Sequence, residues 1–132
     1  MHVLITGGVG FIGSFTAEKL LSLGYNVSIL DNLDPQVHPS GLPDYLPKEI
    51  IDKLQINDIC NREALSNALT NVDIVVHCAA AVGVAQSLYR VHHFLDVNVT
   101  GTALLLQLLS ERDRPLQKLL IFTSMTGYGE GL

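Results

Sequence analysis

The sequence is poor in basic residues, and this shortage excludes two kinds of partner. Lys and Arg total 8 against 13 Asp and Glu, which gives a formal net charge of −5. An acidic chain without a basic cluster does not attract the phosphate backbone of nucleic acid or an anionic lipid surface. We therefore expect neither nucleic acid nor a membrane as a partner.

Cysteine and long apolar segments are also scarce. The two cysteines, Cys60 and Cys78, form no Cys-x-x-Cys pair, so the sequence indicates neither a disulfide framework nor a zinc site. No apolar run approaches the roughly 18 residues of a membrane span, and Met1-His2 leads into a strand-like segment without the features of a signal peptide. These absences favour a protein of the reducing cytoplasm.

Strand-like and helix-like segments alternate along the whole chain. With 132 residues and 48% hydrophobic composition, the sequence is typical of one globular domain. Alternation of this kind predicts an α/β fold in which right-handed crossovers connect the strands of a parallel sheet. The expected strands are 2–6, 26–31, 49–58, 72–77 and 119–124, and the expected helices begin at Phe11 and cover 61–70 and 87–110.

Two segments carry more specific expectations. From Phe11 the apolar residues Ile12, Phe15, Leu20 and Leu23 fall near one side of a helix, and Gly24 follows as its C-terminal stop. Between residues 32 and 47 the chain holds four of its five prolines. This composition predicts a loop, and one too long to be a passive connector.

Glycines follow the first predicted strand in the pattern Gly8-x-Gly10-x-x-Gly13. A glycine-rich turn by itself is often only a turn, but here a strand precedes it, a helix follows it and Asp31 ends the next strand. In this setting Gly7 and Gly8 make the tight turn, Gly10 lets a pyrophosphate approach the backbone, and Gly13 lets the helix lie close to the sheet. The pattern predicts a dinucleotide at the amino end of the helix.

Asp31 indicates which dinucleotide is bound. A carboxylate at this strand end accepts hydrogen bonds from the adenosine ribose and repels a 2′-phosphate. No Lys or Arg lies between Lys19 and Lys48 to attract such a phosphate, so we expect NAD rather than NADP. Asp58 follows the third predicted strand and has two open interpretations, a contact to the adenine edge or a cap on the approach to the next helix.

Several motifs together carry a family resemblance. They are TGGVGFIGS (6–14), LDNL (30–33), NDIC (57–60), HCAAAVGV (77–84), VNVTGT (97–102) and FTSMTGYGEG (122–131). In this order they resemble the N-terminal half of the extended short-chain dehydrogenase/reductase family, in particular its nucleotide-sugar epimerases and dehydratases. LDNLDPQVH (30–38) and SMTGYGEG (124–131) resemble the deoxythymidine-diphosphate-L-rhamnose 4-epimerase branch. The resemblance implies a doubly wound Rossmann sheet with bound NAD.

The resemblance also implies a role for individual residues. Ser124 matches the catalytic Ser/Thr of the family, and Tyr128 is expected to be structural or to lie beside the substrate. Asn98 is expected to fix the backbone beneath the cofactor. By this resemblance Gly7, Gly10 and Gly13 form the pyrophosphate loop, Asp31 and Asn32 take the ribose, Asp58 and Ile59 take the adenine, and Ala79, Ala80 and Ala81 line the side of the fourth strand. The other residues expected to bind the cofactor are Phe11, Ile12, Leu33 and Asn98.

In the resembled family, NAD oxidises C4 of a nucleotide sugar transiently: the tyrosinate of a Tyr-x-x-x-Lys motif removes the hydroxyl proton, hydride leaves for the nicotinamide, and the lysine lowers the pKa of the tyrosine. No tyrosine of this sequence has a lysine four places on. We therefore expect residues 1–132 to be a truncated NAD-binding domain of a nucleotide-sugar 4-epimerase, without the substrate domain and inactive alone. The alternatives are a dehydratase or alcohol dehydrogenase of the same family, or a non-catalytic NAD-binding module.

The remaining candidates receive plainer interpretations. His77 is expected to make one hydrogen bond at the cofactor edge, and Cys78 to be a small buried apolar residue rather than a nucleophile. His92 and His93 are adjacent, so they point apart on a helix surface, and we assign no metal. The helix over 87–110 is apolar on more than one side, which favours either a cover by a further helix or a homodimer, as in the resembled family.

Overall fold

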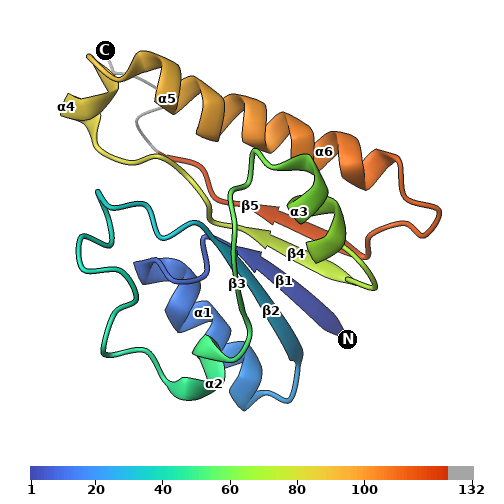
Figure 1. Cartoon of the computed structure of the whole chain (residues 1–132). Helices are drawn as coiled ribbons and strands as arrows, with labels where there is room; N and C mark the ends of the chain where they lie inside the picture. Colours follow the sequence, from blue (N-terminus) through green and yellow to red (C-terminus); the bar gives the residue numbers. More distant parts are fainter. Residues whose placement is uncertain (125–132) are drawn as a thin grey trace, which may run out of the picture.

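Five parallel strands form the centre of the molecule. The computed structural model describes residues 1–124, and its sheet has the order β3-β2-β1-β4-β5 (Figure 1). The predicted doubly wound parallel sheet is confirmed. The strands are β1 (His2–Thr6), β2 (Asn26–Asp31), β3 (Leu54–Ile56), β4 (Ile74–His77) and β5 (Lys118–Ile121).

Helices cover both faces of this sheet (Figure 1). Ala17 of α1 and Ile50 of α2 pack on one face around Ile5, while Leu65 of α3 and Leu105 of α6 pack on the other. The segments α5, η1 and α6 follow one another without a break. The bounds are α1 (Phe11–Ser22), α2 (Lys48–Ile51), α3 (Arg62–Ala68), α4 (Val84–Ser87), α5 (Val91–Leu95), the π-helix η1 (Asp96–Gly101) and α6 (Thr102–Ser110).

The side of α1 that packs on the sheet consists mainly of small residues. Phe15 is 61% exposed and Ile12 48%, whereas the buried residues of this helix are Gly13, Ser14 and Ala17. Small residues on the inner side let the helix backbone approach the sheet closely, which larger apolar side chains would prevent. Of the apolar residues on one side of α1, Leu20 packs against the core while Ile12 and Phe15 stay exposed.

The segment predicted as the third strand begins with a helical turn, α2, and the strand that follows is shorter than expected. The carbonyl of Pro47 accepts hydrogen bonds from the N–H groups of Ile50 and Ile51, and Ile50 is buried in the core. Proline favours a helix start because its φ is already helical. Only Leu54–Ile56 remain as a strand, so the boundaries 49–58 were wrong.

The helical segment predicted over 87–110 is divided. A short helix, α4, is followed by a break, and the continuous helix begins at Val91 and passes through the π segment η1. The helix predicted over 61–70 is confirmed as α3, where the Asn61 side chain caps the first turn by accepting from the N–H of Ala64. Within residues 1–124, no helix has the length and apolar character that crossing a membrane requires.

Candidate functional site

A cavity of about 350 Å³ lies at the carboxyl ends of the strands. In sheets of this topology, ligands bind at the point where the strand order reverses, here between the neighbouring strands β1 and β4. The cavity is bounded by the glycine loop, the loop after β2 and the segment after β4. Its lining includes eleven of the residues predicted to bind a cofactor: Gly7, Gly10, Phe11, Ile12, Gly13, Asp31, Asn32, Ile59, Ala79, Ala80 and Ala81.

The glycine loop is packed so tightly that side chains are excluded at two positions. Gly7 has a φ of 68°, and a Cβ there would lie 2.6 Å from the backbone nitrogen of Ala79. A Cβ on Gly13 would lie 2.2 Å from the carbonyl oxygen of Gly7. The close contact at Gly7 joins the glycine loop to the segment after β4. The close contact at Gly13 brings α1 against the glycine loop, as the sequence pattern predicts.

The amino end of α1 is open toward the cavity. Gly10 is its N-cap and supplies no side-chain hydrogen bond, and the first turn contains no acidic residue. The first N–H groups of a helix have no partner within the helix, and the helix dipole favours negative charge beside them. Because Gly10, Phe11 and Ile12 also line the cavity, this end can hold a phosphate group.

Asp31 holds the two sides of the cavity mouth together. Its Oδ2 accepts a hydrogen bond of 2.9 Å from the N–H of Val9 in the glycine loop, and its Oδ1 accepts one of 2.9 Å from the N–H of Leu33. Leu33 has a φ of 53°, so this bond supports a tight turn after β2. Each carboxylate oxygen keeps a second lone pair, which a ribose hydroxyl can use.

Asp58 lies beside the cavity rather than in its lining. Burial opposes ionisation of this carboxyl, but hydrogen bonds from the N–H of Cys60 and the side-chain amide of Asn32 outweigh that effect and lower its pKa. The carbonyl of Asp58 also accepts from the N–H of Asn61, the cap of α3. These contacts are those of the capping interpretation, and Asp58 positions Asn32 at the cavity wall.

Asn98 also lies outside the lining and contacts it from behind. Its Oδ1 accepts from the N–H of Ala81 at 2.8 Å, and its Nδ2 donates to the carbonyl of Ala81 at 3.0 Å. This is the geometry that the expected backbone-fixing role needs. Ser124 is exposed and not among the described lining residues, which do include Phe122. Tyr128 lies outside the described residues.

The structure adds contacts across the cavity mouth that sequence reasoning missed. The side chain of Gln36 donates to the carbonyl of Val82 at 2.6 Å and accepts from Arg90 at 3.0 Å. The ring of His93 lies 3.6 Å from the carboxylate of Asp34. Nothing in the local pattern of residues 32–47 indicates these partners, because they depend on how the loop folds back.

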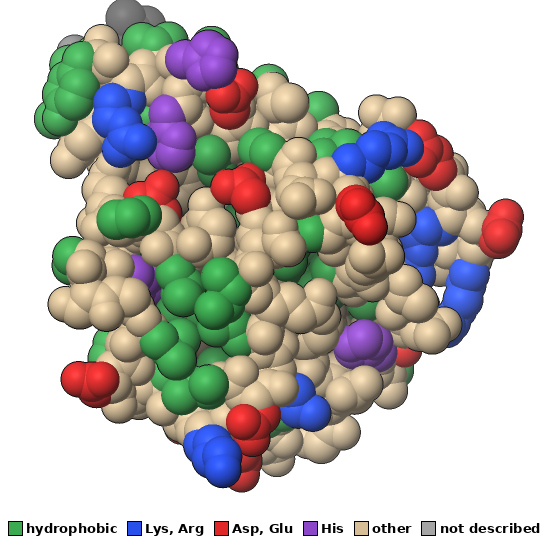
Figure 2. Space-filling model, viewed as in Figure 1, with side chains coloured by type: hydrophobic (Ala, Val, Ile, Leu, Met, Phe, Trp, Pro, Cys, Tyr) green, Lys and Arg blue, Asp and Glu red, His purple; other side chains and the backbone are tan. Residues whose placement is uncertain are grey.

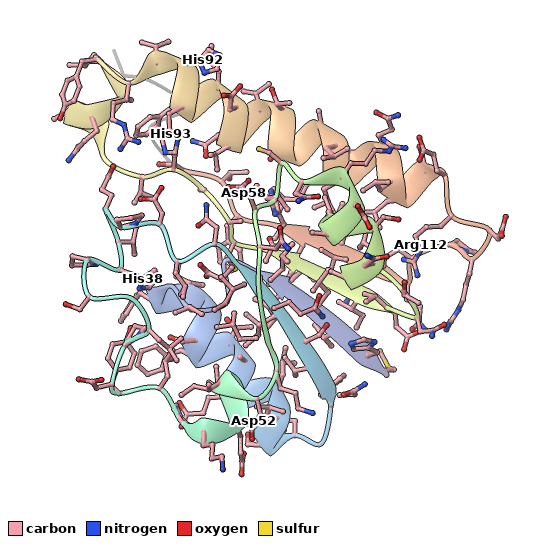
Figure 3. All side chains as sticks on the ribbon, viewed as in Figure 1. His38, Asp52, Asp58, His92, His93 and Arg112 are labelled. Atoms are coloured by element: carbon pink, nitrogen blue, oxygen red, sulfur yellow. The ribbon has the colours of Figure 1, made fainter. Side chains whose placement is uncertain are left out.

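The two histidines of α5 differ in their surroundings. In Figure 3, His93 points toward the loop after β2, whereas His92 lies on the outer side of the helix. His93 lines the cavity, so its assignment to the helix surface is wrong, while His92 forms an ion pair with Asp96 on the exposed side. Among residues 1–124, no group of three or more His, Cys, Asp or Glu side chains is placed to hold a metal ion.

Two further sequence candidates lie at the end of β4. Burial raises the pKa of the Cys78 thiol to about 11, which leaves the thiol neutral and argues against a nucleophile. His77 is 3% exposed and makes two side-chain hydrogen bonds, to Thr6 and to Thr102. His77 is not among the lining residues. The expectation of a single hydrogen bond at the cofactor edge is therefore replaced by two hydrogen bonds behind the cavity.

Known proteins resemble the chain in sequence. The dTDP-L-rhamnose 4-epimerase of Burkholderia thailandensis is 31% identical over 131 residues, which are 98% of this chain and 36% of that protein. The UDP-glucose 4-epimerase of Drosophila melanogaster is 37% identical over 138 residues, 97% of this chain and 38% of that protein. The chain thus spans little more than a third of the length of these relatives.

Solved structures resemble it as well. A UDP-glucose 4-epimerase from Thermotoga maritima with UDP-glucose has a TM-score of 0.86 and 28% identity, over 100% of this chain and 41% of that one. A Thermus thermophilus UDP-glucose 4-epimerase in complex with NAD has a TM-score of 0.70 and 34% identity, over 82% of this chain and 33% of that one. Since the family's sequence pattern also matches residues 3–132, the chain belongs to the NAD dependent epimerase/dehydratase family.

Proposed function

We propose that the chain binds NAD in the cavity at the carboxyl ends of β1, β2 and β4. One observation carries the proposal: the open amino end of α1 and the carboxylate of Asp31 face the same cavity, joined by the hydrogen bond from Val9. The first feature suits a pyrophosphate and the second suits a ribose. The NAD found with the Thermus thermophilus relative supports the same assignment.

The residues present fit this cofactor. The space beside Gly10, which a side chain would fill, leaves the N–H groups of the first turn of α1 accessible to a pyrophosphate. Asn32 and Ile59 flank the adenosine side, and Ala79 to Ala81 line the opposite wall with small side chains. NAD, when bound, supplies reversible hydride transfer. The protein's part in this half is to hold and orient the cofactor.

We further propose that this half serves a nucleotide-sugar 4-epimerase and that residues 1–132 alone do not convert sugar. The 4-epimerases among the relatives support the reaction class. Ser124 alone represents the catalytic set expected from the family, because no Tyr-x-x-x-Lys motif occurs. A dehydratase, an alcohol dehydrogenase or a non-catalytic NAD-binding module would share the same cavity.

Isothermal titration with NAD, followed by an assay with UDP-glucose, UDP-galactose and dTDP-L-rhamnose, tests the two parts of the proposal separately. We expect one NAD per chain and no sugar conversion. A chain that takes up no NAD would contradict the cofactor assignment, and 4-epimerase turnover by these 132 residues would contradict the assignment of catalysis to residues outside them.

Asp31→Asn should weaken NAD binding and reduce the preference for NAD over NADP. An amide has one acceptor oxygen where the carboxylate has two, so one of the two bonds from Val9 and Leu33 is lost, and the charge that repels a 2′-phosphate disappears. We expect roughly tenfold weaker NAD binding, with the NADP affinity unchanged or higher. Titration of each dinucleotide measures the ratio.

Asp52→Asn is the matched control for this substitution. Asp52 follows α2 and lies far from the cavity, at the opposite end of the molecule in Figure 3. The substitution Asp52→Asn changes the net charge by the same amount as Asp31→Asn. If both variants lowered NAD affinity equally, the effect would come from overall charge and not from the contacts of Asp31.

We also propose that two copies pair through the helix formed by α5, η1 and α6. Val91, Leu95, Val99 and Leu106 of this helix are 45% to 58% exposed, and the helix runs along one edge of the molecule (Figure 1). Exposed apolar residues on successive turns form the kind of surface that mediates protein association. Leu104, by contrast, packs within the molecule.

Val99→Asp should therefore shift the chain toward the monomer. A carboxylate in the middle of an apolar contact loses its hydration without gaining a partner. Leu23→Asp is the control, because Leu23 is 60% exposed at the end of α1, away from this helix. Sedimentation velocity would show a monomer for Val99→Asp and a dimer for the control; equal behaviour of the two variants would contradict the proposed interface.

The surface charge and the cysteines agree with the expected partners and compartment. On the face shown in Figure 2, acidic side chains are interspersed with Lys and Arg rather than separated from them. Cys60 and Cys78 are both free thiols. We propose the cytoplasm as the location. The relatives support a nucleotide sugar as the proposed substrate of the enzyme to which this half belongs.

A further inference from the structure

His77 joins three segments of the fold through its two ring nitrogens. Its Nδ1 lies 2.6 Å from the hydroxyl of Thr6 at the end of β1, and its Nε2 lies 3.0 Å from the hydroxyl of Thr102 at the start of α6. Thr6 is 0% exposed and His77 3%, so the bond between them is closed to water, whereas Thr102 is partly buried. A buried imidazole with a partner at each nitrogen has a defined tautomer.

The partner of Thr102 determines that tautomer. The hydroxyl of Thr102 donates to the carbonyl of Asn98 at 2.8 Å, and a hydroxyl has a single hydrogen to donate. Both contacts of Thr102 are satisfied together when Nε2–H donates to its oxygen. Burial lowers the pKa of His77, which favours the neutral ring. Nδ1 is then unprotonated and accepts from the hydroxyl of Thr6.

The hydrogen bonds follow one direction from the cavity wall to the π-helix. The N–H of Ala79 donates to the hydroxyl of Thr6 at 3.4 Å, Thr6 donates to His77, His77 to Thr102, and Thr102 to the carbonyl of Asn98. Aligned hydrogen bonds strengthen one another, most where they are buried, as the bond between Thr6 and His77 is. The side chain of Asn98 in turn hydrogen-bonds both the N–H and the carbonyl of Ala81, a residue of the cavity wall.

We propose that His77 is a positioning residue, whose Nε2–H tautomer ties β1 to η1 and α6 and so holds Asn98 and the wall formed by residues 79–81 in place for the cofactor. The inference rests on the proposed NAD site. A π-helix is rare and frequently marks a functional position, and here it carries Asn98. His77 does not line the cavity itself. It acts through the backbone that does.

Nitrogen-detected NMR of the histidine rings tests the tautomer on the chain without NAD. We expect His77 to have a protonated Nε2 and an unprotonated Nδ1, in slow exchange with solvent. A protonated Nδ1 with a bare Nε2 would reverse the direction of the hydrogen bonds and overturn the proposal, whatever the affinity for NAD.

Thr102→Val removes the link to His77 while keeping the shape of the side chain. We expect hydrogen exchange of the Ala81 amide to accelerate about three- to tenfold and NAD to bind weaker by a similar factor, with Thr102→Ser restoring both. Thr16→Val is the matched control, because the hydroxyl of Thr16 makes the same bond to a carbonyl four residues earlier, that of Ile12, on α1. It should behave like the unsubstituted chain.

The outcomes separate the two proposals. If Thr102→Val leaves the exchange of the Ala81 amide unchanged, or if Thr16→Val accelerates it equally, His77 does not position this wall. If the unsubstituted chain binds no NAD, the proposed function fails. In that case the tautomer of His77 and the exchange rate of the Ala81 amide still test whether His77 positions the wall, since both are measured without NAD.

Discussion

Gly13→Ala should lower the free energy of unfolding by about 3 kcal/mol or more. The new Cβ would lie 2.2 Å from the carbonyl oxygen of Gly7 and 2.7 Å from the Cα of Gly8, and neither backbone atom can move without opening the turn between β1 and α1. An alanine inside a helix usually gains about 1 kcal/mol over glycine. The expected change therefore has the opposite sign to that of helix propensity, which makes it diagnostic of the close contact.

Urea denaturation followed by circular dichroism measures this effect. Ser22→Ala is the control, since Ser22 is an exposed residue of the same helix and its substitution changes propensity without a close contact. We expect the midpoint for Gly13→Ala to fall well below that of both the control and the unsubstituted chain. An unchanged or higher midpoint would mean that α1 lies farther from the glycine loop than the structure places it.

Gly10→Ala should leave the fold intact and weaken NAD binding roughly 10- to 100-fold. Gly10 has a φ of −66°, which alanine adopts freely, and its nearest neighbour to a new Cβ is the carbonyl oxygen of Gly7 at an ordinary 3.4 Å. Nothing in the protein requires a glycine there. The proposed pyrophosphate does, because a methyl group at the cap of α1 would separate it from one or two backbone N–H donors.

The two glycine substitutions thus separate stability from binding. Titration of NAD into Gly10→Ala gives the affinity, and its unfolding midpoint shows whether the fold is retained. Retention of full NAD affinity in a folded Gly10→Ala chain would place the pyrophosphate away from this loop. Loss of the fold in Gly10→Ala would instead show that this glycine is required by the protein itself.

Local sequence patterns predicted where helices and strands begin better than they predicted what these elements contact. The strands at 2–6 and 26–31 and the helix that begins at Phe11 were predicted with their observed starts, because apolar runs, glycine turns and helical spacing act over a few residues. The inner side of α1 has no comparable local signal, because the close approach of Gly13 and Ala17 depends on the sheet. The helical turn after Pro47 was missed because its apolar residues also suit a strand.

The sequence by itself determined the order of strands and helices, the glycine turn and the place of Asp31, since each depends on neighbouring residues along the chain. Tertiary structure alone decided the contacts between Gln36 and Val82, which are 46 positions apart, and between Thr6 and His77, which are 71 apart. Such pairs meet only after β1, β2 and β4 have aligned in one sheet. Hydrogen bonds between distant polar side chains leave no periodic pattern in a sequence, so the wall behind the cavity became visible only in the folded chain.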